Sequence, residues 1–243
     1  MHDFDVEASP RFYARLAGVL YLLIIVTGIF GEVFVRNAFV VTADPAATAI
    51  RITADPSLWR LGTAVVLFEH LLDVPVALIL YLLMRPVSRF LALLALLFTL
   101  VSTAALVAFK LTLLVPIFLL GNAQYLKALD PGLLQALSYV AIRADAYGFG
   151  IGLVYFGAFC LVVGHLIFRS SFFPRVLGVL MGIAGLCYLT NSFALIAAHA
   201  FADTIYPLIL VPAFVAELSF CLWLIVKGVD EERWRARASL RSS

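Results

Sequence analysis

The sequence predicts an all-α polytopic membrane protein, a bundle of six transmembrane helices. Hydrophobic residues make up 64% of the 243 residues and charged residues only 13%, whereas soluble domains are roughly 45–50% apolar and about 25% charged. The apolar residues gather in long runs that lack the alternation of a membrane β-barrel. Helices are expected because every backbone polar group in lipid must be hydrogen-bonded within the protein.

Six apolar runs are long enough to cross the membrane, which takes about 20 helical residues. The first run exceeds the roughly 7–15 apolar residues of a signal peptide, so we expect it to remain as a span. We expect residues 1–243 to form a single integral membrane domain. The six predicted spans cover residues 14–35, 59–84, 88–115, 144–168, 174–198 and 205–227.

Basic residues predict the orientation, because cytoplasmic loops carry an excess of Lys and Arg. Eleven basic residues fall on one side of the predicted bundle and five on the other, which favours cytoplasmic placement of both termini. The eleven are Arg11, Arg15, Arg85, Arg89, Arg169, Arg175, Lys227, Arg233, Arg235, Arg237 and Arg241. The five are Arg36, Arg51, Arg60, Lys127 and Arg143.

The two long outer connections are each predicted to contain a short interfacial helix. Asp44-Pro45 and Asp55-Pro56 bracket the first connection, and in each pair Asp suits a helix cap and Pro the first helical position. This predicts a helix from Pro45 to Ala54. The second connection contains Asp130-Pro131-Gly132, followed by an amphipathic segment predicted as a helix from Leu133 to Ile142.

The most informative residues are Glu69, His70 and Asp73, because they lie inside the apolar run 59–84. Acids in a span are costly, roughly 2.5–3.5 kcal/mol each on insertion scales, and usually face a partner, a cavity or a pathway. Glu69 and Asp73 are four residues apart and share one helix face. Counting about 1.5 Å per residue from Trp59 puts Glu69 near the bilayer middle.

Glu217 lies at a similar depth in the last span, about 16 Å from its outer end. Glu69, Asp73 and Glu217 are therefore expected to share a level. Close carboxyls beside the titratable His70 suit proton handling or general acid catalysis. The alternative is a hydrogen-bonded polar cluster that only joins helices.

A second layer of candidate ligand-binding residues lies nearer the outer ends of the spans: Glu32, Lys110, Asp145 and Asn191. They either line the same cavity higher up or reach the interface. Lys110 either extends to the interface along its aliphatic stem or pairs with Glu32, Asp145 or Glu69. Asn191 either binds a ligand or bridges helices.

Several site classes are excluded or disfavoured by the pattern. His and carboxylates are metal ligands, but no spacing typical of a metal site is present, so no metal and no cofactor are predicted. The sequence has no nucleotide-binding P-loop and no serine nucleophile elbow. The net charge of +2, without a basic stretch interleaved with aromatics, indicates no nucleic-acid partner.

A set of motifs runs along nearly the whole chain. The motifs are Ala14-Arg15-Leu16-Ala17-Gly18-Val19-Leu20-Tyr21-Leu22-Leu23, Glu32-Val33-Phe34-Val35-Arg36, Asp44-Pro45-Ala46-Ala47-Thr48-Ala49, Leu58-Trp59-Arg60-Leu61-Gly62, Arg85-Pro86-Val87, Phe172-Phe173-Pro174-Arg175-Val176-Leu177-Gly178-Val179-Leu180 and Pro212-Ala213-Phe214-Val215-Ala216-Glu217-Leu218. This combination is similar to the bacterial family called domain of unknown function 4386. The resemblance implies about six spans and a bacterial cytoplasmic (inner) membrane location, and it brings no assigned activity or catalytic residues.

Three hypotheses of function follow. The first is binding or transport of a small molecule or ion at the polar mid-membrane site. The second is an intramembrane enzyme acting on a lipid or isoprenoid, with Glu69, Asp73 or Glu217 as general acid, by analogy with terpene cyclases that use embedded acids. The third is a structural or sensory subunit. Membrane lipid and a small hydrophobic or ionic ligand are the expected partners.

Overall fold

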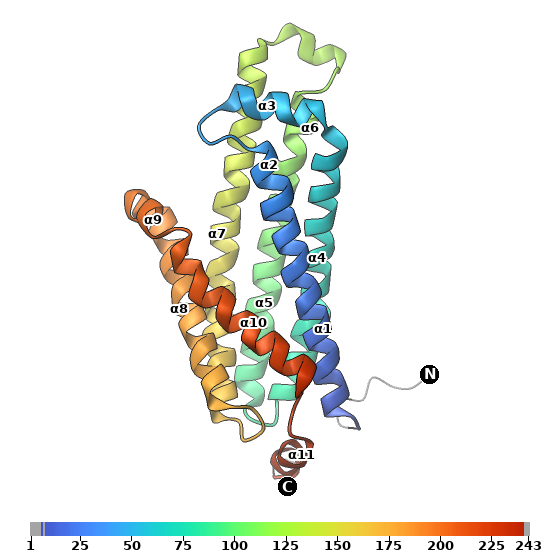
Figure 1. The fold of residues 1–243 in the computed structure, drawn as a ribbon, viewed down its shortest axis with the longest axis vertical. Coiled ribbons are helices and arrows are strands. Elements are labelled where there is room, and N and C mark those ends of the chain that lie inside the picture. The colour runs from blue at the N-terminus through green and yellow to red at the C-terminus, as the bar shows by residue number, and fades with distance from the viewer. Residues whose placement is uncertain (1–5, 7, 241–243) are drawn as a thin grey trace.

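The computed structural model describes residue 6 and residues 8–240, and this part of the chain contains helices and turns without a β-strand. Six helical spans form the bundle in Figure 1, which confirms the predicted fold class. The spans are α1 (Pro10–Ile29) continued by η1 (Phe30–Arg36) and α2 (Asn37–Phe39); α4 (Pro56–Met84); α5 (Arg89–Lys110) continued by η2 (Leu111–Leu114) and α6 (Val115–Leu119); α7 (Pro131–Arg169); α8 (Arg175–Ala197); and η4 (Leu208–Leu210) with α10 (Val211–Val226).

Helix α3 (Pro45–Ala54) confirms the predicted helix in the first outer connection and lies across the end of the bundle (Figure 1). The Asp44 carboxylate accepts a hydrogen bond from the Ala47 amide at 2.8 Å, and the Asp55 carboxylate caps α4 by accepting one from the Leu58 amide at 2.9 Å. Both Asp-Pro pairs therefore start helices as their sequence indicates.

The second outer connection differs from its prediction. Residues 133–142 do not form a separate helix but are the first turns of α7, which runs unbroken for 39 residues. Asp130 caps this helix by accepting a hydrogen bond from the Leu133 amide at 3.0 Å, and Pro131 occupies its first turn. At about 1.5 Å per residue α7 is longer than the hydrocarbon core is thick, so its first turns project beyond the bundle (Figure 1).

Both ends of the described chain lie at the same end of the bundle (Figure 1), which we call the terminal end. Beyond the predicted spans the chain forms α11 (Glu231–Ser239), whose Trp234 is buried and donates its indole N–H to the Leu83 carbonyl at 2.9 Å. Two further short elements are η3 (Gln124–Ala128), which precedes α7, and α9 (His199–Ile205), which follows α8 at its end away from the terminal end (Figure 1). Arg241, one of the eleven basic residues used to predict the orientation, lies outside the described residues.

Small residues bring α7 and α8 into close contact. Gly164 faces Gly178, and Gly157 faces Gly185. In lipid, where lipid tails are as apolar as side chains, such close backbone approach is a main source of helix association. The outward faces of the spans carry many exposed apolar side chains, such as Phe68 and Leu71 on α4, as a lipid environment requires.

This packing predicts opposite effects for two nearby glycines of α8. A methyl group at Gly178 would lie 2.6 Å from the Gly164 carbonyl oxygen and 2.6 Å from the Phe168 nitrogen, whereas a methyl group at Gly182 would meet nothing within 4 Å. We expect Gly178→Ala to lower the unfolding temperature in detergent, because overpacking costs about 1–3 kcal/mol. Gly182→Ala should keep or raise it, since Ala favours a helix by about 1 kcal/mol. Equal unfolding temperatures would contradict the packing.

Candidate functional site

Glu217 on α10 is buried and accepts hydrogen bonds from two tyrosines on other helices. The Tyr21 hydroxyl of α1 donates to Oε2 at 2.7 Å, and the Tyr188 hydroxyl of α8 donates to Oε1. One carboxyl therefore joins three spans. Sequence reasoning did not identify either tyrosine as a partner, although a phenol hydroxyl inside an apolar run requires a hydrogen-bond partner.

Asp73 on α4 has a separate set of partners. Its Oδ2 lies 3.2 Å from Nδ1 of His70, one turn earlier on the same helix, and accepts a hydrogen bond from the Thr103 hydroxyl of α5 at 3.1 Å. The opposite ring nitrogen of His70, Nε2, is buried without a hydrogen-bond partner among the described residues. Asp73 therefore joins α4 to α5 and orients the His70 ring.

Asp145 on α7 forms the centre of the outer polar layer. It is fully buried, with Lys110 Nζ of α5 at 2.8 Å from Oδ1 and Arg36 Nη1 of η1 at 2.8 Å from Oδ2. Lys110 is itself buried. Of the two predicted alternatives, it therefore pairs with an acid, Asp145, and does not extend to the interface. Arg36, counted only as an outer basic residue from the sequence, also lies 3.6 Å from Glu32.

Glu69 differs from these three acids. It is half-buried and has no hydrogen bond or ion pair with any residue in the described part of the chain. Its carboxyl packs against α1 at Gly28, where an added Cβ would lie 3.1 Å from Oε1. Two residues later α1 changes to the π-helical segment η1, a distortion that is frequent at functional sites.

Glu69, His70 and Asp73 lie within about one turn of α4, and Glu217 lies on α10. We call these four residues the mid-span cluster, after the depth that the sequence predicts for them. Asp73 and Glu217 are hydrogen-bonded to different helices.

Asn191 is buried on α8, three residues after Tyr188, whose hydroxyl bonds to Glu217. The hydroxyl of the adjacent Ser192 is buried without a hydrogen-bond partner in residues 8–240. Among the described residues, no hydrogen bond joins Asn191 to Lys110 or Asp145.

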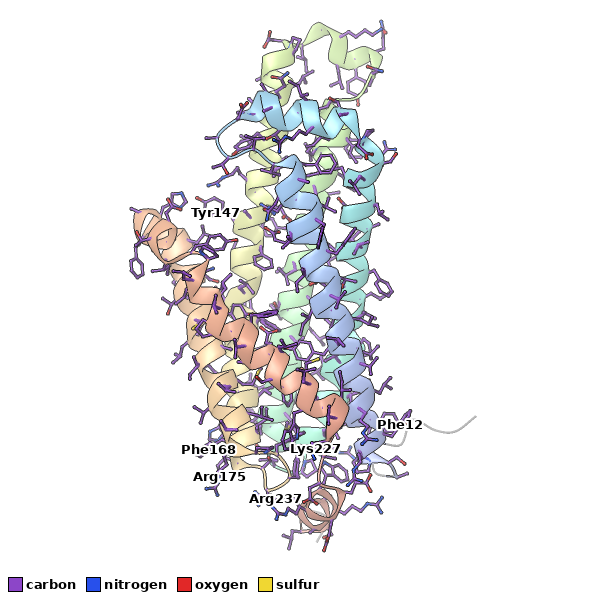
Figure 2. All side chains as sticks on the ribbon, in the orientation of Figure 1. Phe12, Tyr147, Phe168, Arg175, Lys227 and Arg237 are labelled. Atoms are coloured by element: carbon purple, nitrogen blue, oxygen red, sulfur yellow. The ribbon has the colours of Figure 1, made fainter. Side chains whose placement is uncertain are left out.

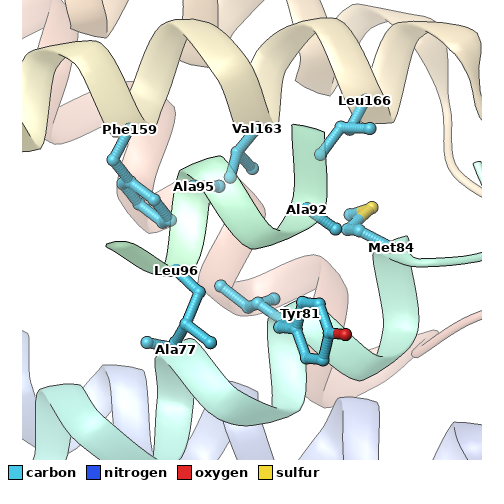
Figure 3. Close-up of a pocket in the computed structure, with 10 residues that line it drawn as sticks. Ala77, Tyr81, Met84, Ala92, Ala95, Leu96, Phe159, Val163 and Leu166 are labelled. Carbon is cyan, nitrogen blue, oxygen red and sulfur yellow. The ribbon is translucent and has the colours of Figure 1, made fainter. Parts of the chain in front are cut away.

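A small cavity of about 10 Å³ lies between α4, α5 and α7 (Figure 3). Its lining is apolar apart from the Tyr81 hydroxyl, with Phe159 and Leu96 on opposite sides. This volume corresponds to about one water molecule, and none of the acids of the mid-span cluster contributes to the lining. Within the described residues, no three His, Cys, Asp or Glu side chains are grouped as metal ligands.

Comparison with known proteins identifies a family for most of the chain. The family described as "Domain of unknown function (DUF4386)" matches residues 16–228. An uncharacterized protein from Archaeoglobus fulgidus is 28% identical over 158 residues, which cover 65% of this chain and 78% of the relative. No solved structure matches the chain.

The Asp145 ion pairs predict a large loss of stability on substitution. Asp145→Asn leaves the buried Lys110 without a compensating charge, and breaking a buried pair typically costs about 3–5 kcal/mol. The matched control is Glu32→Gln, because Glu32 is 54% exposed and 3.6 Å from Arg36, a type of pair that contributes about 1 kcal/mol or less. Thermal unfolding of both variants in detergent micelles is the measurement. Similar losses in the two variants would contradict the assigned roles.

Proposed function

The chain belongs to the DUF4386 family, whose description names no activity, and we propose a function from the geometry of its mid-span cluster. The protein binds a small cation at Glu69, in the simplest case a proton, and transfers it across the bilayer. Glu69 would be the binding group. The His70–Asp73 pair would be the neighbouring acceptor, one turn further along α4.

The observation that carries this proposal is that Glu69 has no hydrogen-bonding or ion-pairing partner among the described residues. Asp73, Asp145 and Glu217 each have two hydrogen-bonding or ion-pairing partners, including one on another helix. Their role in joining helices is sufficient to explain their presence. Glu69 is half-buried in a span without such a bond, and an ionisable group in a span without a partner is expected to act on a ligand or ion.

The chemistry of the mid-span cluster also supports a proton as the ligand. The donors to Asp73 and Glu217 are hydroxyl groups and an imidazole, and none is a permanently charged Arg or Lys. A carboxyl beside neutral donors can change its protonation state without leaving a cation unpaired. By contrast, Asp145 is held by Lys110 and Arg36, and if it took up a proton it would leave Lys110 without a counter-charge and Arg36 with only Glu32 at 3.6 Å.

A structural role is the second candidate, and it is favoured by the bonds of Asp73, Asp145 and Glu217 between helices. The enzyme hypothesis has less support, because the acids it needs line neither the cavity in Figure 3 nor the larger groove of about 350 Å³ at the terminal end. A substitution at Glu69 distinguishes proton transfer from a structural role, because only the first requires the Glu69 carboxyl.

We expect Glu69→Gln to remove proton transfer without loss of stability, because the amide keeps the shape and no bond is broken. Transfer is measured as acidification of a trapped pH dye in proteoliposomes under a potassium diffusion potential. The control is Asp203→Asn, which removes an acid from the exposed α9. Proton entry in wild type and Asp203→Asn but not in Glu69→Gln supports the proposal. A lower unfolding temperature in Glu69→Gln would instead assign Glu69 to helix packing.

Reactivity toward dicyclohexylcarbodiimide gives a test that does not depend on transport. This apolar reagent modifies protonated carboxyls that are accessible from lipid. Mass spectrometry of the modified protein should find the adduct on Glu69 and not on Glu217, whose two oxygens are occupied by tyrosine hydroxyls. An adduct on Glu217 with none on Glu69 would contradict the proposed binding group.

The direction of transfer depends on the orientation, and we propose that the terminal end faces the cytoplasm of a bacterial inner membrane. The excess of basic residues at that end supports this orientation. Green fluorescent protein fused after residue 243 is expected to fluoresce, and alkaline phosphatase fused at the same position is expected to be inactive. Active phosphatase at the same position would reverse the orientation.

A further inference from the structure

A groove at the terminal end of the bundle carries two arginines that the mid-span cluster does not use. Its volume is about 350 Å³, and its lining comes from the start of α5, the end of α7 and α11. The polar lining residues are Ser88, His165, Arg169 and Arg237, and the apolar ones include Leu91. The lining contains no acid.

The two arginines in this groove have no ion pair or hydrogen bond with a residue that the structure describes. Other arginines at the same end do have partners, as Arg233 does with Asp230 at 3.3 Å and with the Ser171 carbonyl at 3.2 Å. Arg169 and Arg237 therefore bring two guanidinium groups to one groove without a neutralising acid among the described residues. Guanidinium groups bind phosphate oxygens through paired hydrogen bonds.

The position of Arg237 is fixed by the docking of α11. Trp234 is buried and bonded to the Leu83 carbonyl, and residues three apart lie on the same helix face. Arg237 therefore faces the bundle, and Figure 2 labels it at the terminal end with Lys227, Arg175 and Phe168. The buried Trp234 thus fixes α11 against the bundle, and this places the guanidinium of Arg237 in the groove.

Apolar side chains next to the groove identify the source of the phosphate. Phe90, two residues from Ser88, is 73% exposed, and Phe168, next to Arg169, is 44% exposed. Arg169 is the last residue of the α7 span and Ser88 precedes the α5 span, so the groove opens at the level of lipid headgroups. We propose that it binds the phosphate of an anionic membrane lipid through Arg169 and Arg237, with the acyl chains against these exposed apolar side chains.

The test compares lipid binding by the full chain with that of two charge-matched double variants. The probes are dioleoyl phosphatidylglycerol, dioleoyl phosphatidylcholine and inorganic phosphate, each titrated in detergent and followed by native mass spectrometry. Arg169→Gln/Arg237→Gln removes the groove arginines. Lys227→Gln/Arg235→Gln removes two exposed charges outside the groove lining at the same end. Arg169→Gln alone serves as a second variant if the groove double variant unfolds.

We expect the groove double variant to bind phosphatidylglycerol about 30-fold more weakly than wild type, from the usual contribution of a basic residue at an anionic lipid surface. The control should bind as wild type does, and phosphatidylcholine should bind weakly to all. Equal phosphatidylglycerol binding by both double variants would overturn the proposal. Saturation by inorganic phosphate, or equal binding of the two lipids by wild type, would overturn the assignment to an anionic lipid.

Discussion

The bundle depends on the requirement that a carboxyl buried in hydrocarbon must find donors on neighbouring helices. Three carboxyls meet this requirement and together connect all six spans. Glu217 joins α10 to α1 and α8, Asp73 joins α4 to α5, and Asp145 joins α7 to α5 and to η1 at the end of the first span. Hydrophobic burial cannot select helix neighbours in lipid, so these bonds and the close glycine contacts specify the arrangement.

The donors change in kind along the bundle. The Asp145 carboxylate is neutralised by Lys110 and Arg36 at the outer ends of their spans, whereas the mid-span carboxyl of Glu217 is held by hydroxyl groups. Fixed ion pairs suit a rigid closure of the end opposite the terminal end, because protonating Asp145 would leave the buried Lys110 without a counter-charge. Hydroxyl donors suit a region whose charge changes, because a hydroxyl can donate to a carboxylate and accept from a protonated carboxyl.

The sequence predicted the spans well because the number of apolar residues needed to cross a bilayer is fixed by its thickness. It also predicted α3, since an Asp-Pro pair specifies a helix start through local contacts. It did not predict that residues 133–142 continue into α7, because an amphipathic segment and the start of a long helix have the same periodicity. The sequence also did not predict the ion pair between Arg36 and Asp145. Such a pair depends on which helices are neighbours, and no pattern in a single sequence shows which helices are neighbours.

Because helix adjacency cannot be read from one sequence, the sequence predicted the candidate site only in part. Depth counting found Glu69, Asp73 and Glu217 together, but it could not distinguish acids that hold helices from an acid that is free to act. The structure separates them, because hydrogen bonds account for Asp73 and Glu217 and leave Glu69 against Gly28 without one. A span acid without a compensating bond is expected where function requires it. Glu69 is therefore the position where stability and the proposed proton transfer should separate on substitution.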